Sequence, residues 1–204
     1  VRKEDISFPY ATLIEEKPLF KNNKVDRRAP VYSPDGKEIA YIEDRDRLMI
    51  MNLESGKTRQ ITDGSQCYST TGSFSYSWSP DGKWILMSYC ARNHYPYDDI
   101  GIVSTKGGEP MINLTESGYT DSAPQWVLGG NAILFASERY GMRNHASWGT
   151  LEDVMIVFLN RKAYDDFRMT KEEKELQKEI AGLSEDKEEK SDKKEEKVED
   201  IVVE

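Results

Sequence analysis

The hexapeptide Tyr32-Ser33-Pro34-Asp35-Gly36-Lys37 decides the fold of this chain, because it returns 46 residues later as Trp78-Ser79-Pro80-Asp81-Gly82-Lys83. In each copy the proline fixes φ, the aspartate tolerates the turn conformation beside it, and the glycine takes positive φ. An aromatic residue precedes each turn and an apolar run follows it. Each copy therefore predicts a strand, a tight turn and a second strand, at the spacing of about 40–50 residues typical of four-stranded propeller blades.

The stretches around the two turns match at four elements. The first repeat predicts strands at residues 29–32, 38–42, 48–53 and 58–62, and the second at 74–78, 84–89, 100–104 and 111–115. A glycine-containing hairpin turn separates the third strand from the fourth in both repeats. Two complete four-stranded blades are therefore expected.

A third, degenerate repeat begins at residues 123–126. Its turn, residues 127–131, has lost the proline and the aspartate, but Gly129 and Gly130 supply positive φ. Strands are predicted at 132–137 and 154–159, and the second of these is continuously apolar, as in a strand buried on both faces. Trp78, Trp126 and Tyr32 occupy equivalent positions and are expected in the core between blades.

The C-terminal part differs in composition. Residues 171–200 hold 8 Lys and 13 acidic residues, a net charge of −5 out of −9 for the whole chain. Asn160 can cap a helix through Phe167, and Thr170-Lys171-Glu172-Glu173 has capping-box spacing. Leu176, Ile180 and Leu183 form a narrow apolar stripe. The charged run that follows is too polar to repay the entropy of ordering.

We therefore expect an all-β fold, a β-propeller segment of about three four-stranded blades that is too short to close a ring. A helical and charged low-complexity insertion follows it. The expected divisions are the end of a preceding blade or an edge segment (1–28), three blades (29–66, 67–118 and a partial one at 119–160), a helical insertion (161–183), a disordered charged linker (184–200) and the start of a truncated strand (201–204).

The repeats resemble the propeller repeats of the TolB and tricorn-protease families. The features that carry the resemblance are the aromatic-Ser-Pro-Asp-Gly-Lys turns, the Asp99-Ile100-Gly101-Ile102-Val103-Ser104 strand and the closing Ile-Thr or Leu-Thr. Residues 138–149 and 153–160 are more specific and resemble bacterial tricorn-like serine peptidases of the Bacteroidetes type. The resemblance implies a PDZ-like module and a catalytic domain, with a serine nucleophile and a histidine base, C-terminal to Glu204.

Catalysis by this chain itself is not expected. His94 and His145 are its only histidines, and no Gly-x-Ser-x-Gly nucleophile context accompanies them. Asp35 and Asp81 sit at repeat-equivalent turn positions and are interpreted as structural. The histidines are too few for a metal cluster, so neither a metal nor another cofactor is expected. Cys67 and Cys90 lack metal-ligand spacing and leave the redox compartment open.

Two long aromatic connections follow second strands and are expected on one rim of the propeller. They carry the residue types enriched in binding surfaces: Arg92, His94, Tyr95, Tyr97, Tyr140, Arg143, His145 and Trp148. These are the candidate contacts to a peptide or protein substrate, with the alternative that some only tie the loops down. The Ser33-Pro34-Asp35-Gly36 and Ser79-Pro80-Asp81-Gly82 motifs are assigned a structural role.

Two functions are compatible with these residues. The first is a non-catalytic propeller of a tricorn-like serine peptidase that admits or orients peptides; the second is a TolB-like protein-interaction propeller without enzymatic activity. The remaining blades and the catalytic domain of a parent chain are the expected neighbours, and pairing of open edges in a homo-oligomer is the alternative. The net negative charge of the chain argues against a nucleic-acid partner. The sequence contains no run of 18 apolar residues, so no membrane span is predicted. The resemblance favours the periplasm, with the cytoplasm as alternative.

Overall fold

The computed structural model describes residues 16–21, 24–67, 74–91, 97–141, 150–185 and 200–203, with the backbone alone for residues 181–185. In these ranges the chain forms three antiparallel sheets and two α-helices. The first sheet contains β1 (Arg27–Tyr32), β2 (Glu38–Glu43), β3 (Arg47–Asn52) and β4 (Thr58–Gln60). The second contains β5 (Tyr76–Trp78), β6 (Trp84–Tyr89), β7 (Asp99–Ser104) and β8 (Ile112–Asn113). The third contains β9 (Asp121–Val127), β10 (Ala132–Ser137) and β11 (Asp153–Phe158).

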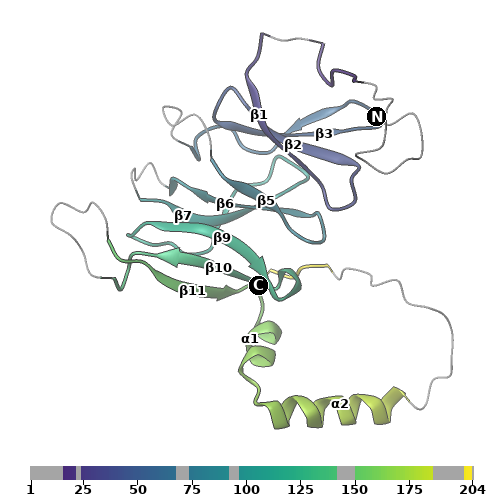
Figure 1. Cartoon of the computed structure of the whole chain (residues 1–204), viewed down its shortest axis with the longest axis vertical. Coiled ribbons are helices and arrows are strands. Elements are labelled where there is room, and N and C mark those ends of the chain that lie inside the picture. The colour runs from purple at the N-terminus through teal and green to yellow at the C-terminus, as the bar shows by residue number, and fades with distance from the viewer. Residues whose placement is uncertain are drawn as a thin grey trace, which may run out of the picture.

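Each sheet is a meander in which strands adjacent in sequence are paired. Figure 1 shows the sheets lying one against the next in chain order, from the purple first sheet to the green third. This arrangement confirms the expected all-β, incomplete propeller. The residue limits assigned above to whole blades, insertion and linker stay predictions.

Two bulges in first strands were not foreseen. The pairing of β1 with β2 shifts between Arg28 and Val31, and that of β10 with β9 shifts between Leu134 and Ala136. An Ala-Pro pair lies at each shift, and Ala29 and Ala123 both have positive φ, of 50° and 49°. Proline lacks a backbone N–H, so a bulge is where a strand can accept it.

The core lies between the sheets. Ala40, Leu48 and Ile50 of the first sheet pack with Trp78, Ile85 and Val103 of the second. The second sheet packs in the same way on the third, through the buried side chains of Leu86, Ile100, Ile102, Ile133, Phe135 and Leu159. Each fully buried aliphatic side chain stabilises the fold by about 1.5–3 kcal/mol. The central strands of each sheet therefore fasten it to its neighbour.

The prediction that Tyr32 belongs to the core between blades was wrong. Trp78 is buried and its indole Nε1 donates to the carbonyl oxygen of Val31 in the preceding sheet, at 3.2 Å. Trp126 packs against the core between the second and third sheets. Tyr32 is 63% exposed, because no sheet precedes the first one in the part of the chain that the structure describes.

The prediction that residues 154–159 form a strand buried on both faces was also wrong. β11 is the outer strand of the third sheet, and Val154 is 74% exposed. Its equivalents in the first two sheets, Leu48 and Ile100, are fully buried. Leu48 packs against the second sheet and Ile100 against the third, whereas no sheet follows the third one in the part of the chain that the structure describes.

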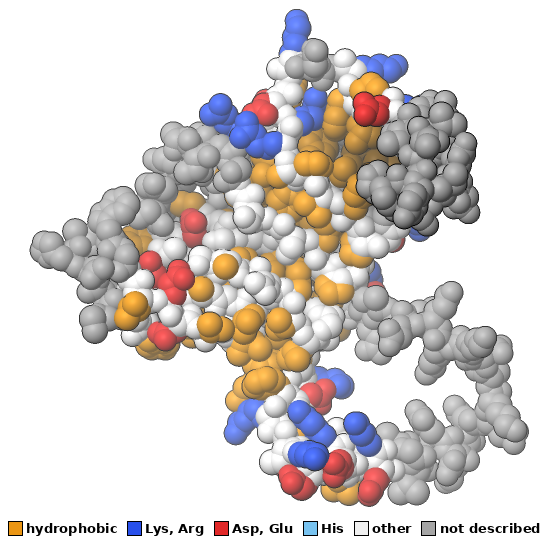
Figure 2. All heavy atoms as spheres, in the orientation of Figure 1, with side chains coloured by type: hydrophobic (Ala, Val, Ile, Leu, Met, Phe, Trp, Pro, Cys, Tyr) orange, Lys and Arg blue, Asp and Glu red, His pale blue; other side chains and the backbone are white. Residues whose placement is uncertain are grey.

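Two helices follow the third sheet. Asn160 caps α1 (Arg161–Arg168) by accepting the Ala163 amide, as its position predicted. α2 (Lys171–Glu185) begins at the predicted capping box, in which Thr170 and Glu173 exchange side-chain to backbone hydrogen bonds of 2.7 and 3.2 Å. Figure 2 shows apolar side chains where α1 meets β11 and mixed blue and red side chains over α2. Leu176 and Ile180 are exposed, so this part of the predicted apolar stripe faces solvent.

Residues 200–203 return to the sheets. The Ile201 amide donates to Asp81 Oδ2 at 2.9 Å, and the Ile201 side chain is buried in the second core. The Asn160 side-chain amide donates to Val202 O at 3.2 Å. Residues 201–203 form no strand in the described structure, and Glu204 lies outside the described residues. The two ends of the stretch from Asn160 to Ile201 therefore meet at one place beside the third sheet.

Candidate functional site

The two Ser-Pro-Asp-Gly turns have the same internal hydrogen bonds. Ser33 Oγ donates to Asp35 Oδ1 at 2.7 Å and accepts the Glu38 amide at 2.9 Å. Ser79 Oγ donates to Asp81 Oδ1 at 2.5 Å and accepts the Trp84 amide at 2.9 Å. The serine therefore joins the turn carboxylate to the first amide of the second strand.

The turn carboxylates are engaged within their own turns. The Ser33 hydroxyl and the Lys37 backbone amide hold the pKa of Asp35 below its ordinary value, because both stabilise the carboxylate. Asp81 uses its second oxygen to accept the Ile201 amide. Asp35 and Asp81, together with Pro34 and Pro80, border a cavity of about 360 Å³. These contacts support a structural role rather than acid–base catalysis.

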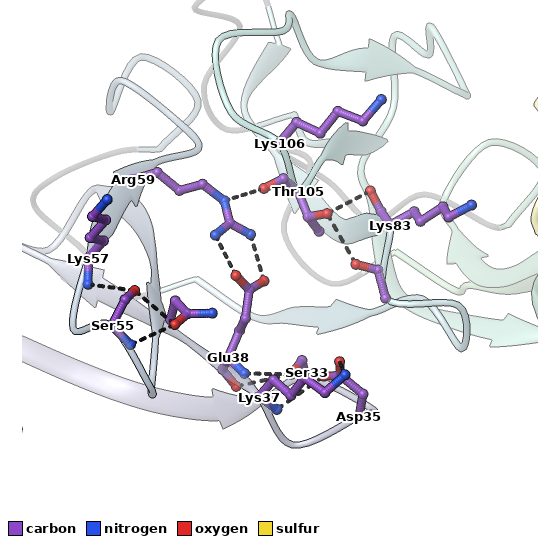
Figure 3. Close-up of polar contacts among 12 residues, drawn as sticks. Ser33, Asp35, Lys37, Glu38, Ser55, Lys57, Arg59, Lys83, Thr105 and Lys106 are labelled. Carbon is purple, nitrogen blue, oxygen red and sulfur yellow. Dashed lines mark hydrogen bonds and ion pairs between the residues drawn. The ribbon is translucent and has the colours of Figure 1, made fainter.

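Arg59 joins the first sheet to the second at the same end of the molecule. Its guanidinium makes a bidentate pair with the Glu38 carboxylate at 2.6 Å, and its Nε donates to the carbonyl oxygen of Thr105 at 2.6 Å. Figure 3 shows Arg59 reaching between Glu38 and Thr105. We call this end, formed by residues 33–37, 79–83 and 105–109, the turn rim.

The opposite end carries the described ends of the two long connections, between β6 and β7 and between β10 and β11. We call it the long-loop rim and define it by the described residues 97–99, 119–121 and 138–141. Of the predicted binding residues, Tyr97 and Tyr140 lie here, with exposed fractions of 36% and 77%. The other six lie outside the described residues: Arg92, His94, Tyr95, Arg143, His145 and Trp148. Their assignment stays a prediction.

Asp121 fastens the ends of both connections together. Its amide donates to Asp98 O at 2.8 Å, and its own carbonyl accepts the Ser88 hydroxyl at 2.8 Å. Its carboxylate pairs with Arg139 Nη2 at 2.8 Å, and Arg139 Nε donates to Ser137 Oγ at 2.9 Å. Asp121 is fully buried, and its Oδ1 has no partner among the described residues. We call Asp121 and Arg139 the rim anchor.

The rim anchor was not predicted from the sequence. A related pair occurs in the first sheet, where Arg27 and Glu43 are register partners in the first two strands and form a 3.0 Å ion pair. Asp121 likewise starts its first strand, and Arg139 follows its second. The register partner of Asp121 is Ser137, so Arg139 lies two residues beyond the position equivalent to Glu43. The first-sheet pair is therefore a partial signal: opposite charges near the ends of the first two strands can pair.

Two neighbouring aspartates make the rim acidic. The buried Asp99 carboxylate accepts the Ser117 amide at 2.8 Å and the Asn113 side-chain amide at 2.6 Å. Burial raises the pKa of Asp98, and the charge of Asp99 adds to that rise. Asp98 and Asp99 directly follow Tyr97 in the chain, and the exposed tyrosine rings suit cationic or aromatic groups of a ligand.

The described residues give no further chemistry of a catalytic kind. Within the described ranges, no group of three or more His, Cys, Asp and Glu side chains is arranged to hold a metal ion. In the same ranges, no helix has the length and apolar character needed to cross a membrane. Both histidines, His94 and His145, lie outside the described residues.

Comparisons with known proteins agree with the fold. No protein-family model matches the chain. The crystal structure of the tricorn protease matches with a TM-score of 0.51 and 16% identity, covering 70% of this chain and 14% of that one. Oligogalacturonate lyase from Vibrio parahaemolyticus matches with a TM-score of 0.50 and 13% identity, over 72% of this chain and 39% of the lyase. At these identities the likeness shows the fold alone.

A sequence relative comes from Bacillus subtilis. Its uncharacterized peptidase YuxL is 36% identical over 86 residues, which cover 40% of this chain and 12% of the relative. The matched segment is thus a small part of that protein. Taken with the sheet order and the stacked cores, the comparisons show that this chain has the fold of a β-propeller segment, a fold that it shares with the tricorn protease structure.

Proposed function

We propose that the chain is the non-catalytic propeller portion of a tricorn-like serine peptidase, and that its long-loop rim binds peptide segments and orients them for a catalytic domain elsewhere in the parent protein. The observation that carries the proposal is the pair of exposed tyrosines, Tyr97 and Tyr140, at the ends of connections joined by the rim anchor. Binding residues gather on loops that a rigid scaffold positions.

The chemistry of the rim supports a polypeptide ligand. Tyrosine is enriched among the residues that dominate binding energy, because it offers a large apolar face and a polar tip. Asp98 and the buried Asp99 directly follow Tyr97 in the chain. The peptidase YuxL and the tricorn protease support a peptidase as the parent.

The proposal is tested with fluorescein-labelled β-casein, an unfolded polypeptide, and the purified chain. Binding is measured by fluorescence anisotropy, and the casein is then examined by mass spectrometry for cleavage. We expect saturable binding without cleavage, and a Kd about thirtyfold weaker in the Tyr97→Ala/Tyr140→Ala variant, since two tyrosine contacts of about 1 kcal/mol each together contribute about 2 kcal/mol.

Tyr32→Ala is the matched control, because Tyr32 is 63% exposed and adjoins the turn rim. It should leave the Kd unchanged. Cleavage of casein by the purified chain would overturn the non-catalytic assignment. Absent binding, or equal Kd values for the double variant and the wild type, would overturn the rim assignment.

A further inference from the structure

We propose that Cys67 and Cys90 form an intramolecular disulfide bond, which ties the connection between the first two sheets to the end of β6. They are the two cysteines of the whole sequence. The inference concerns a covalent modification beside the long-loop rim, and it stands whether or not the rim binds peptides.

The backbone brings the two residues together. The Cys90 amide donates to the carbonyl oxygen of Gln66 at 3.0 Å. That oxygen lies next to the Cα of Cys67 across a planar peptide bond, so the Cα atoms of Cys67 and Cys90 are at most about 6–7 Å apart. Disulfides span Cα separations of about 4.4–6.8 Å. The separation is therefore within reach of an S–S bond.

The side-chain environment also places Cys67 against the end of β6. Cys67 packs on the cluster of Met87, Tyr89 and Ala91. Because side chains alternate along a strand, closure of the disulfide requires the backbone at Cys90, just beyond β6, to rotate its side chain toward Cys67. Both cysteines are half-buried thiols in this structure. Burial raises the pKa of Cys67 to about 12, and the charges of Asp46, Asp98 and Cys90 add to the rise. The effect of Cys90 on this pKa is consistent with the closeness of the two residues that the backbone hydrogen bond shows.

The bond forms by exchange with a disulfide oxidant such as oxidised glutathione. One cysteine thiolate attacks an oxidant sulfur, which releases one reduced glutathione and leaves a mixed disulfide on the protein. The second cysteine then attacks the protein sulfur and releases the second glutathione. In total the two thiols lose two protons and two electrons, and the oxidant takes up both electrons to become two thiols.

The test equilibrates the folded chain with glutathione buffers at a series of oxidised-to-reduced ratios. Remaining thiols are blocked with N-ethylmaleimide, and intact mass and tryptic peptides are measured. The expected product is monomeric, carries no maleimide, and yields a cross-link between tryptic peptides 60–83 and 84–92. The single variants Cys67→Ser and Cys90→Ser should give at most one glutathione adduct and no cross-link.

A urea-unfolded sample of the wild-type chain separates proximity in the fold from chance encounter. The measured quantity is the ratio of oxidised to reduced glutathione at which half of the molecules carry the disulfide (half-closure). If the fold holds the cysteines together, this ratio should be at least about tenfold lower for the folded chain than for the chain in urea. Two glutathione adducts, two maleimide adducts throughout the series, or the same half-closure ratio with and without urea would each overturn the proposal.

Discussion

Replacing Arg139 by alanine should destabilise the chain strongly, because it removes the partner of a fully buried carboxylate. Asp121 has no exposed surface, and the Arg139 side chain is 22% exposed and lies 2.8 Å from Asp121 Oδ2. Breaking a buried ion pair from one side costs about 3–5 kcal/mol. Partial exposure of Arg139 lets water reach the site, so the lower value, about 3 kcal/mol, is expected.

The assay is equilibrium urea unfolding followed by tryptophan fluorescence. With a denaturant slope of about 2–3 kcal/mol/M, the midpoint of Arg139→Ala should fall by about 1 M or more. Arg161→Ala is the matched control, since Arg161 forms an exposed 3.1 Å pair with Asp165 within α1, and its loss should cost less than about 0.5 kcal/mol. Equal midpoint shifts in the two variants would refute the role of the rim anchor.

A double variant distinguishes loss of the charge pair from loss of packing. Asp121→Asn/Arg139→Met removes both charges and keeps side chains of similar size. It should be more stable than Arg139→Ala, because no uncompensated charge remains buried. A double variant less stable than the single one would show that the energetic explanation is wrong.

Three further predictions concern the turn rim and the contacts between sheets. Gly130→Ala should lower the free energy of unfolding in urea by about 1–3 kcal/mol more than Gly129→Ala. Both glycines have positive φ, but only at Gly130 would an added Cβ meet Ile201 Cγ1 at 3.0 Å and Pro80 Cδ at 3.1 Å. Equal losses in the two variants would contradict this packing. Ser79→Ala and Ser33→Ala should each cost about 1–3 kcal/mol, because each leaves a second-strand amide without its acceptor, and a cost below about 0.5 kcal/mol in either would count against the shared turn network. Burial raises the pKa of Tyr76 above its ordinary value, so its protonated form stabilises the fold and that stability falls as pH rises above about 10. Comparing urea midpoints at about pH 8 and about pH 10.5, Tyr76→Phe should lose less stability than the wild type.

The repeat unit was predictable because its determinants are local. Pro34, Asp35 and Gly36 specify a turn by their own backbone preferences, and the same is true at Pro80, Asp81 and Gly82. Their spacing predicted the order of strands within the sheets, and the structure confirms that order. Asn160 and Thr170 were equally readable as helix starts, since a cap is a contact between residues near in sequence.

Features that depend on distant neighbours were missed or mistaken. Tyr32 has the same sequence context as Trp78, yet its burial depends on a sheet that would precede it. The apolar composition of β11 suggested a strand buried on both faces, but the face that carries Val154 can be buried only by a sheet that would follow the third one. The contact of Ile201 with Asp81 joins residues 120 positions apart. A single sequence does not encode such pairings in any local pattern.

The candidate binding site was predicted only in outline. Tyr97 and Tyr140 are exposed at the rim where the topology of a propeller places them. The buried pair of Asp121 and Arg139 was not predicted, because a charged residue in a sequence ordinarily indicates a solvent-exposed position. The rim is therefore better described as two exposed aromatic positions on a buried ionic support than as a set of loop residues.

Hydrogen–deuterium exchange with and without β-casein tests most directly whether the long-loop rim is the binding surface. The account predicts slower amide exchange on casein binding in the segments that contain residues 97–99, 119–121 and 138–141. It predicts no change at residues 33–37 and 79–83 of the turn rim, whose amides are engaged within the turns. Protection confined to the turn rim, or binding without protection of the long-loop rim, would contradict the account.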